Sequence, residues 1–380
     1  MFEDLINRLR AAQRYTSAPV SLHAPVFHGK EREYVLDAID STFVSSVGEY
    51  VNRFERMLQE ITGAVRAVVC VNGTAALEIS LRLAGVQAGD CVITQALSFV
   101  ATANAISHSG GVPVFIDVDA TTLGMSPAAL RTFLEEHCRI SANACIFKES
   151  GQRVGACVPM HTFGFPCLIE DITAICREWR IPVVEDAAEA LGSLYRGRAC
   201  GTFGEMGVFS FNGNKIVSTG GGGAIITQNE ALGRKLKHLT TTAKVPHPWE
   251  FRHDAVAWNF RMPNLNAALG CAQLEQLDAF LEIKRHRAQV YAEVFADMDW
   301  TFISEPPESR SNYWLCAVLA PDRKTRDIFL EETRQASFMT RPVWEPLQTL
   351  PMYKDCRCGD LTTTMNIADR LVNLPSGVSQ

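Results

Sequence analysis

The stretch that decides the fold is Gly207-Val-Phe-Ser210-Phe-Asn-Gly-Asn-Lys215, continued by Ser218-Thr-Gly220-Gly-Gly-Gly223. An apolar run that predicts a strand ends in a Gly/Asn turn, and this turn carries one lysine. Four glycines then allow close backbone approach before the next apolar run. They do not form a phosphate-binding P-loop, because no Gly-Lys-Ser/Thr follows. A lysine in such a turn can lose its proton and form an imine with an aldehyde; the alternative is a solvated surface charge.

Apolar, β-branched runs alternate with helical patterns on both sides of this stretch, which is typical of parallel βαβ units. One helical pattern, Ala128–Glu136, is opened by Ser126-Pro127, a serine cap followed by a first-turn proline. The sequence therefore predicts an α/β fold with a mostly parallel central sheet covered by helices, and ligands beyond the carboxyl ends of its strands. The predicted strands are Ala67–Val71, Cys91–Thr94, Val112–Ile116, Ala156–Met160, Pro182–Glu185, Gly207–Phe211 and Gly223–Thr227.

The composition changes in the last third of the chain. A long helical pattern runs from Asn264 toward Asp297, and short strands and turns follow around Pro306-Pro307, Pro321 and Pro342. We predict two domains, a large one over residues 1–255 and a smaller α+β domain over residues 256–380, hinged on the long helix.

A second segment of interest is Asn72-Gly73-Thr74-Ala75-Ala76, where a strand ends and a helix of small residues is expected to begin at Thr74. The first amides of a helix are free and carry a partial positive charge, so they can bind phosphate. An ordinary turn with a threonine cap is the alternative.

A third segment, Val183-Val-Glu185-Asp186, places two acids at the end of a buried strand. A carboxylate there is costly unless a cation or a strong donor meets it. Asp186 could meet a protonated pyridine nitrogen, the charge pair that makes pyridoxal phosphate an electron sink. A helix-capping aspartate is the alternative.

Bulk composition excludes several classes. The 380 residues are 47% hydrophobic and 21% charged with a net charge of −6, which is typical of a globular enzyme and argues against a nucleic-acid partner. The 12 cysteines are scattered, and the lone Cys356-Arg-Cys358 predicts no metal site. Residues 1–10 lack the apolar core of a signal peptide, and no apolar run approaches the roughly 20 residues of a membrane span. We expect a cytoplasmic protein with free thiols and no membrane contact.

Five motifs occur together in one order. They are Asn72-Gly73-Thr74-Ala75-Ala76-Leu77, Ser98-Phe99-Val100-Ala101-Thr102, His161-Thr-Phe-Gly164, Glu185-Asp186-Ala187-Ala188 and Phe209-Ser-Phe-Asn-Gly-Asn-Lys215. With them the chain resembles the DegT/DnrJ/EryC1/StrS sugar aminotransferases, a branch of the fold-type-I pyridoxal-phosphate enzymes, from about Gly48 to Pro375. This resemblance implies an aminotransferase with pyridoxal 5'-phosphate as cofactor.

The resemblance also implies roles for matching residues. Lys215 would bond the cofactor, Asp186 would bind its ring nitrogen, and Phe99 would stack on its ring. Gly73, Thr74 and Ser210 would hold its phosphate.

Two positions near the cofactor remain open. Trp258-Asn259-Phe260-Arg261-Met262 is similar to the family stretch whose asparagine reaches the phosphate from the partner subunit, which implies a homodimer with shared active sites; a local turn residue is the alternative for Asn259. Glu189 stands where many relatives have glutamine or histidine near the cofactor's phenolic oxygen. A carboxylate there must be protonated or turned away.

The resemblance implies glutamate as amino donor and a nucleotide-linked 4-keto-6-deoxy sugar as acceptor. Segments of the second half, such as Ser311-Asn-Tyr-Trp314, look most like enzymes that use UDP-4-keto-6-deoxy-N-acetylglucosamine, and GDP-4-keto-6-deoxymannose is the alternative. His253 and Arg341 are candidate substrate contacts, because cations suit phosphate oxygens; each could also be a surface charge.

Two other classes are weaker. A nicotinamide dehydrogenase would need Gly-x-Gly-x-x-Gly at its first strand end, and the turn at Asn72 lacks it. An idle sensor built on the same fold would not need both Lys215 and Asp186.

Overall fold

The computed structural model describes residues 2–12 and 19–378 and has a mainly parallel sheet at its centre. The strands lie in the order β1-β11-β10-β7 and β6-β2-β3, and bridges from Cys157 to Val183 and from Met160 to Asp186 join the two groups. Only β11 runs antiparallel to its neighbours within this sheet. The strands are β1 (Arg66–Cys70), β2 (Cys91–Gln95), β3 (Val112–Ile116), β6 (Val154–Val158), β7 (Val184–Asp186), β10 (Met206–Ser210) and β11 (Gly223–Thr227).

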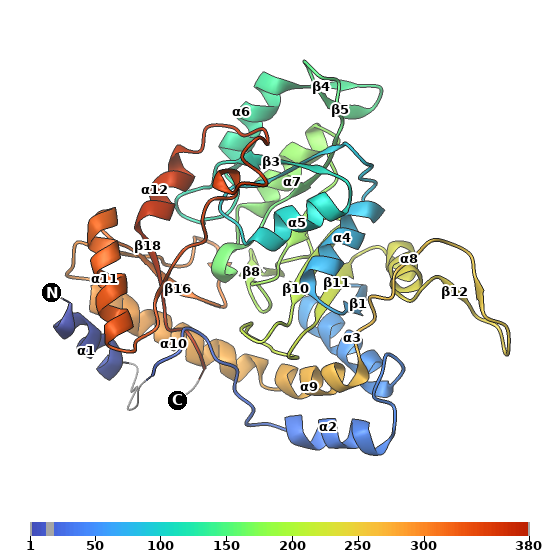
Figure 1. The fold of residues 1–380 in the computed structure, drawn as a ribbon, viewed down its shortest axis with the longest axis horizontal. Coiled ribbons are helices and arrows are strands. Elements are labelled where there is room, and N and C mark those ends of the chain that lie inside the picture. Colours follow the sequence, from blue (N-terminus) through green and yellow to red (C-terminus); the bar gives the residue numbers. More distant parts are fainter. Residues whose placement is uncertain (1, 13–18, 379–380) are drawn as a thin grey trace.

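Helices cover both faces of this sheet (Figure 1). Neighbouring strand residues point to opposite faces, so Val68 packs in the core under α4, α5 and α8, whereas Val69 packs in the core under α2, α3 and α9. Burial on both faces explains why the strands read as continuous apolar runs, and the predicted α/β fold is confirmed. The helices are α2 (Glu31–Asp40), α3 (Glu49–Thr62), α4 (Gly73–Leu83), α5 (Val100–His108), α6 (Pro127–His137), α7 (Ile169–Glu178), α8 (Glu230–Thr240) and α9 (Asn264–Leu274).

The helix boundaries confirm one prediction and correct another. α6 begins at Pro127, with the Ser126 side chain accepting a bond from the Ala129 amide. The long pattern after Asn264 is two helices, α9 and α10 (Leu277–Phe295), and the Gln276 side chain at the break donates to Glu31 on α2. A pattern along one helix cannot show such a tertiary bond.

The C-terminal elements form a second layer around an antiparallel sheet in the order β14-β16-β18-β17. The N-terminal helix α1 (Glu3–Ala12) packs in the same core, where the Phe2 ring lies 5.9 Å from Trp300 and 5.3 Å from Phe329. The domain division at residue 256 stays a prediction. The elements of this layer are β14 (Thr301–Phe302), β16 (Cys316–Leu319), α11 (Arg323–Gln335), β17 (Arg341–Pro342), α12 (Thr362–Arg370) and β18 (Leu371–Leu374).

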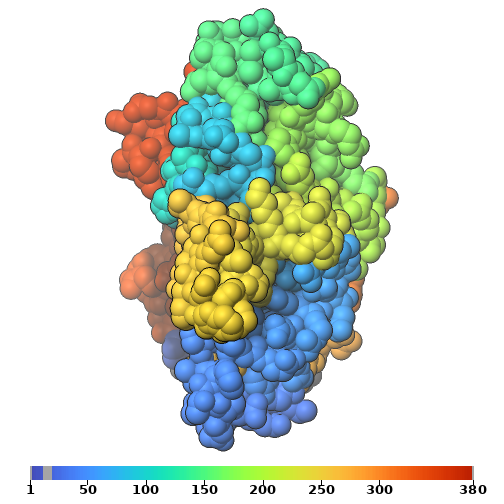
Figure 2. Space-filling view, turned by 90° about the vertical axis from the view of Figure 1, so that its right-hand side faces the viewer, coloured from blue at the N-terminus to red at the C-terminus, as the bar shows by residue number. Residues whose placement is uncertain are grey.

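A hairpin of β12 (Lys244–Val245) and β13 (Arg252–His253) projects from the body (Figure 1), and Figure 2 looks onto that side, where it stands out in yellow. Smaller elements are β4 (Cys138–Ser141), β5 (Ala144–Phe147), β8 (Leu194–Tyr195), β9 (Arg198–Ala199), β15 (Ser309–Arg310) and the 3-10 turns Thr162–Gly164 and Leu347–Thr349. All 12 cysteines are free, as predicted. Within residues 2–12 and 19–378, no helix combines the length and the apolar character that crossing a membrane requires.

Candidate active site

The carboxyl ends of β1, β7 and β10 meet at a cavity of about 210 Å³, which we call the central cavity. Ligands of such sheets bind at this edge. Seven of the predicted site residues line it together: Gly73, Thr74, Phe99, Asp186, Glu189, Ser210 and Lys215.

One end of the central cavity is the start of α4. The helix begins at Gly73, one residue before the expected start at Thr74. It is capped by Asn72, whose side chain accepts a bond from the Ala75 amide at 2.8 Å, so the alternative of a threonine cap is wrong. The amides of Gly73 and Thr74 have no acceptor within the helix, and both residues line the cavity.

β10 and β11 pack closely against the turn at Asn72-Gly73. Gly223 lies in register with Cys70 and Ser210, and a Cβ atom there would sit 2.5 Å from the Asn72 carbonyl carbon. A Cβ atom on Gly73 would lie 3.1 Å from the Ser210 Cβ atom. Small residues therefore bring two amides and one hydroxyl to a single point, an arrangement suited to phosphate.

Asp186 ends β7 and is buried. Its Oδ2 accepts a bond from the Thr102 hydroxyl at 2.7 Å, and its Oδ1 accepts one from the Ala188 amide at 3.2 Å. Burial nevertheless raises the pKa of this carboxyl above its ordinary value. A positively charged group in the cavity would restore the carboxylate.

Lys215 lies in the turn after β10, where its amide bonds the Asn212 carbonyl. Its side chain is only 11% exposed, and Nζ lies 3.1 Å from Glu189 Oε1. The other Glu189 oxygen accepts a bond from the Phe163 amide at 2.9 Å. Burial raises the pKa of Glu189 to about 7, with the nearby Lys215 amine opposing the shift.

Aromatic rings line the opposite wall. Phe99 is 47% exposed, and its ring lies 6.0 Å from that of Trp344. Trp314 lies against the lysine, with Lys215 Nζ 3.9 Å from the indole ring centre. Phe163 lies behind them, 5.1 Å from Trp344 and 6.4 Å from Trp314.

Sequence reasoning gave no role to three of these contacts. Thr102 stands in the quoted Ser98–Thr102 motif, and its hydroxyl proves to bond Asp186. Trp314 stands in the quoted segment 311–314, but nothing local shows that it reaches Lys215, 99 positions away (314 − 215 = 99). No signal singled out Trp344.

Three predicted residues lie elsewhere. Asn259 is exposed, with its Oδ1 accepting a bond from Arg261 Nε at 2.8 Å. His253 is on the projecting hairpin, where Nδ1 lies 2.7 Å from the Thr242 carbonyl. Arg341 lines a different cavity of about 460 Å³, beside Phe338. Their roles in binding stay predictions.

The residues of the central cavity fit pyridoxal phosphate by their chemistry. The amides at the start of α4 and Ser210 suit its phosphate, the buried Asp186 suits a protonated ring nitrogen, and Phe99 offers a ring face. Lys215 lines the same cavity. This arrangement can hold an aldehyde-bearing aromatic phosphate and move a proton beside it.

Comparison with known proteins gives consistent results. A family model described as the DegT/DnrJ/EryC1/StrS aminotransferase family matches residues 26–379. The chain is 34% identical to the EpsN protein of Bacillus subtilis (strain 168) over 94% of this chain and 91% of that one. It is 33% identical to a GDP-perosamine synthase of Escherichia coli O157:H7 over 94% and 93%. The crystal structure of the aminotransferase TlmJ from Streptoalloteichus hindustanus superposes with a TM-score of 0.85, at 28% identity and 94% coverage of each chain.

Proposed function

The chain belongs to the DegT/DnrJ/EryC1/StrS aminotransferase family and is a pyridoxal-phosphate-dependent sugar-nucleotide aminotransferase, and on that premise we propose that it moves an amino group from glutamate to GDP-4-keto-6-deoxymannose. The main support for this function is that Lys215, Asp186 and the start of α4 line one cavity.

When bound, the cofactor supplies an aldehyde that takes up the donor's nitrogen and a ring that accepts electrons. The chain supplies the rest. Lys215 would anchor the aldehyde carbon and, when its amine is free, would accept and return the transferred proton at Nζ. Asp186 would keep the ring nitrogen protonated, and the amides of Gly73 and Thr74 with the Ser210 hydroxyl would hold the phosphate.

Glu189 has a defined position in this scheme. Its Oε1 lies against Lys215 Nζ, and a pKa near 7 lets it take or release a proton at neutral pH. A protonated Glu189 could lie beside the cofactor's phenolic oxygen without repulsion.

The choice of a GDP-linked acceptor is based on the names of similar proteins. A 33% identical protein that matches nearly the full chain is named GDP-perosamine synthase, which favours the GDP-linked acceptor over the UDP-linked one that the second-half segments suggest. The UDP-linked sugar remains the second candidate on those segments.

A homodimer with shared sites is part of the proposal. Trp249 and Phe251 on the projecting hairpin and Val256 just after it are 77%, 82% and 95% exposed, which is costly for large apolar groups unless another chain covers them. Asn259 follows this hairpin and is exposed, so it is available to a second copy. In that arrangement each protomer would contribute Asn259 to the phosphate of its partner.

The test is turnover of the purified protein loaded with pyridoxal phosphate. Glutamate is added with either GDP-4-keto-6-deoxymannose or UDP-4-keto-6-deoxy-N-acetylglucosamine, and the aminated sugar nucleotide is measured by mass spectrometry. Preferential amination of the GDP-linked sugar is expected. Turnover of the UDP-linked sugar alone would show that the UDP-linked sugar is the acceptor. Turnover of neither sugar would contradict both proposed acceptors.

A further inference from the structure

The catalytic lysine has a neighbour that comes from the C-terminal half of the chain. Lys215 Nζ lies 3.9 Å from the centre of the Trp314 ring and 3.1 Å from Glu189 Oε1. The amine is thus flanked by an aromatic face and a carboxylate. An ammonium over an indole face is stabilised by the ring's quadrupole, and more strongly when water is excluded.

Trp314 is held through both its indole ring and its backbone. Its Nε1 donates to the Asn214 carbonyl at 2.7 Å, one residue before the lysine. The Trp314 backbone amide donates to Asn312 Oδ1 at 2.7 Å. The Trp314 backbone carbonyl accepts a bond from the buried Lys284 amine at 3.1 Å.

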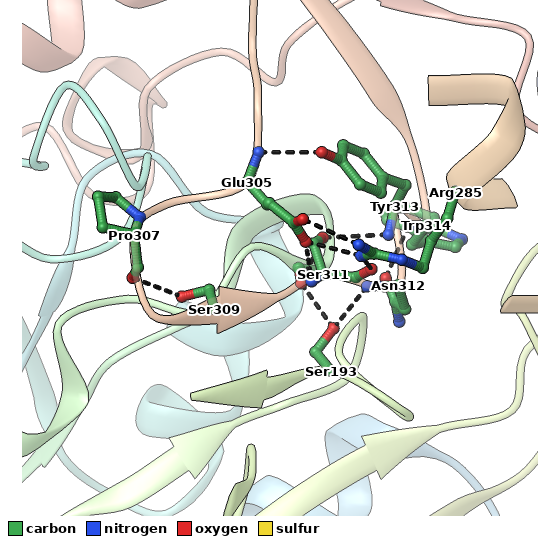
Figure 3. A network of polar contacts seen from close by, with 10 residues as sticks. Ser193, Arg285, Glu305, Pro307, Ser309, Ser311, Asn312, Tyr313 and Trp314 are labelled. Atoms are coloured by element: carbon green, nitrogen blue, oxygen red, sulfur yellow. Dashed lines mark hydrogen bonds and ion pairs between the residues drawn. The ribbon is translucent and has the colours of Figure 1, made fainter. Parts of the chain in front are cut away.

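Segment 311–314 is also bonded to Ser193 (Figure 3) and to the backbone of Glu189 and Leu191. The Asn312 side chain donates to the carbonyls of Glu189 and Leu191 at 2.8 and 2.9 Å, and its amide donates to Ser193 Oγ at 3.0 Å. Asn312 therefore bonds the backbone of both Glu189 and Trp314, whose carboxylate and ring flank Lys215.

A second group of bonds holds the start of this segment (Figure 3). Ser311 donates its amide to Glu305 at 2.8 Å, and Arg285 bonds both the Glu305 carboxylate and the Ser311 carbonyl. Tyr313 lies at φ 46°, a left-handed conformation that bulky residues rarely adopt. Such a conformation persists only where surrounding bonds enforce it, and such residues cluster at functional sites.

We propose that Trp314 is a positioning residue that, together with Glu189, holds the Lys215 amine in the central cavity whenever that amine is free; this rests on the role proposed above for Lys215. Whenever the Lys215 amine is not bonded to the cofactor, a flexible lysine side chain would be able to turn out of the central cavity. The fixed indole face and the carboxylate keep it in place for proton transfer.

The test uses the cofactor-free protein, so that it reads the Lys215 environment directly. Brief reductive methylation with formaldehyde and cyanoborohydride modifies only deprotonated amines. Mass spectrometry of the Lys215 peptide over a pH series gives the pH of half-maximal labelling, with exposed Lys235 as an internal reference. The groups that act on Lys215 are Glu189 by contact, and Asp186 and His23 at longer range.

Removing the ring in Trp314→Leu should lower the half-labelling pH. A cation–π contact changes a protonation equilibrium by about 2-fold at exposed sites and about 30-fold at desolvated ones, or roughly 0.4 to 1.5 pH units. Trp314→Phe keeps an aromatic face but loses the bond to Asn214, so an intermediate shift is expected. Trp344→Leu is the matched control, because it removes an indole from the same cavity without removing the ring that lies over Lys215.

Three results would overturn the proposal: an unchanged half-labelling pH in Trp314→Leu, equal shifts in the leucine and phenylalanine variants, or an equal shift in Trp344→Leu. If the leucine variant does not fold, an unchanged value in Trp314→Phe overturns it as well. Loss of the assigned role of Lys215 would show separately, as turnover that survives Lys215→Ala.

Discussion

The Lys215 amine donates a 3.1 Å hydrogen bond to Glu189 Oε1 inside the central cavity. The carboxylate is also fixed by the Phe163 amide, and burial raises its pKa to about 7. This pair links the expected chemistry of the site to pH and gives the first prediction.

Glu189→Gln should change how stability depends on pH. Because the pKa of Glu189 is raised from 4.5 to about 7, the folded cofactor-free protein binds more protons than the unfolded chain between these values. This contribution is present in full below pH 4.5 and is lost as the pH rises through 7, at up to about 1.4 kcal/mol per pH unit. Urea unfolding from pH 5 to 8 should therefore show the parent losing stability relative to Glu189→Gln. The exposed Glu149→Gln should follow the parent; parallel curves for Glu189→Gln would contradict the prediction.

Lys215→Ala should abolish covalent attachment of pyridoxal phosphate. Turnover with glutamate should fall by at least about a thousandfold, because both the attachment point and the proton carrier are lost. Borohydride reduction followed by mass spectrometry of the intact protein measures the attachment. Lys235→Ala, an exposed lysine on α8, should keep both properties. Normal turnover by Lys215→Ala would refute the site.

Gly223→Ala should weaken cofactor binding. The added Cβ atom would sit 2.5 Å from the Asn72 carbonyl carbon and displace the turn that carries the free α4 amides. Overpacking of this kind costs about 1 to 3 kcal/mol of stability, and we expect the dissociation constant for pyridoxal phosphate to rise at least about tenfold. Gly213→Ala, whose Cβ would meet nothing within 4 Å, is the control. Equal affinities in the two variants, measured by fluorescence titration, would count against the phosphate assignment.

Lys284→Met should alter stability at alkaline pH. The Lys284 amine is buried among the Trp314 and Ser376 carbonyls and His23, and burial lowers its pKa from 10.5 to about 7. The unfolded chain therefore binds more protons than the folded one between these values, so this group makes stability rise as the pH increases from about 7. Lys284→Met should remove that rise in denaturant unfolding at pH 7 to 9. Should the variant keep the slope of the parent, Lys284 is charged when folded.

Mixing two inactive variants should restore activity if the sites are shared between subunits. Lys215→Ala and Asn259→Asp chains are unfolded together, refolded and assayed. In random dimers about a quarter of all sites carry neither change when residues 215 and 259 of one site come from different chains. Separate refolding is the control. No recovery in the mixture, with dimers confirmed by sedimentation, would place both residues of a site on one chain.

Much of the site could be predicted from sequence because its parts are strand ends. Gly73, Asp186 and Lys215 each follow an apolar strand, and the carboxyl ends of neighbouring strands in such a sheet meet at one edge. The turn residues after each strand stand in short motifs, whereas the order of the strands, which completes the cavity, is known from the structure.

The sequence by itself determined the α/β fold, the family and the position of Gly73, Asp186 and Lys215 at or just after strand ends. Only the tertiary structure decided the contacts between distant segments: the Thr102 bond to Asp186 over 84 positions, the Asn312 bond to the Glu189 carbonyl over 123, and the Trp314 ring on Lys215. Hydrophobic period and turn residues specify local geometry, whereas these contacts depend on how the C-terminal layer packs onto the central sheet, which no local pattern encodes.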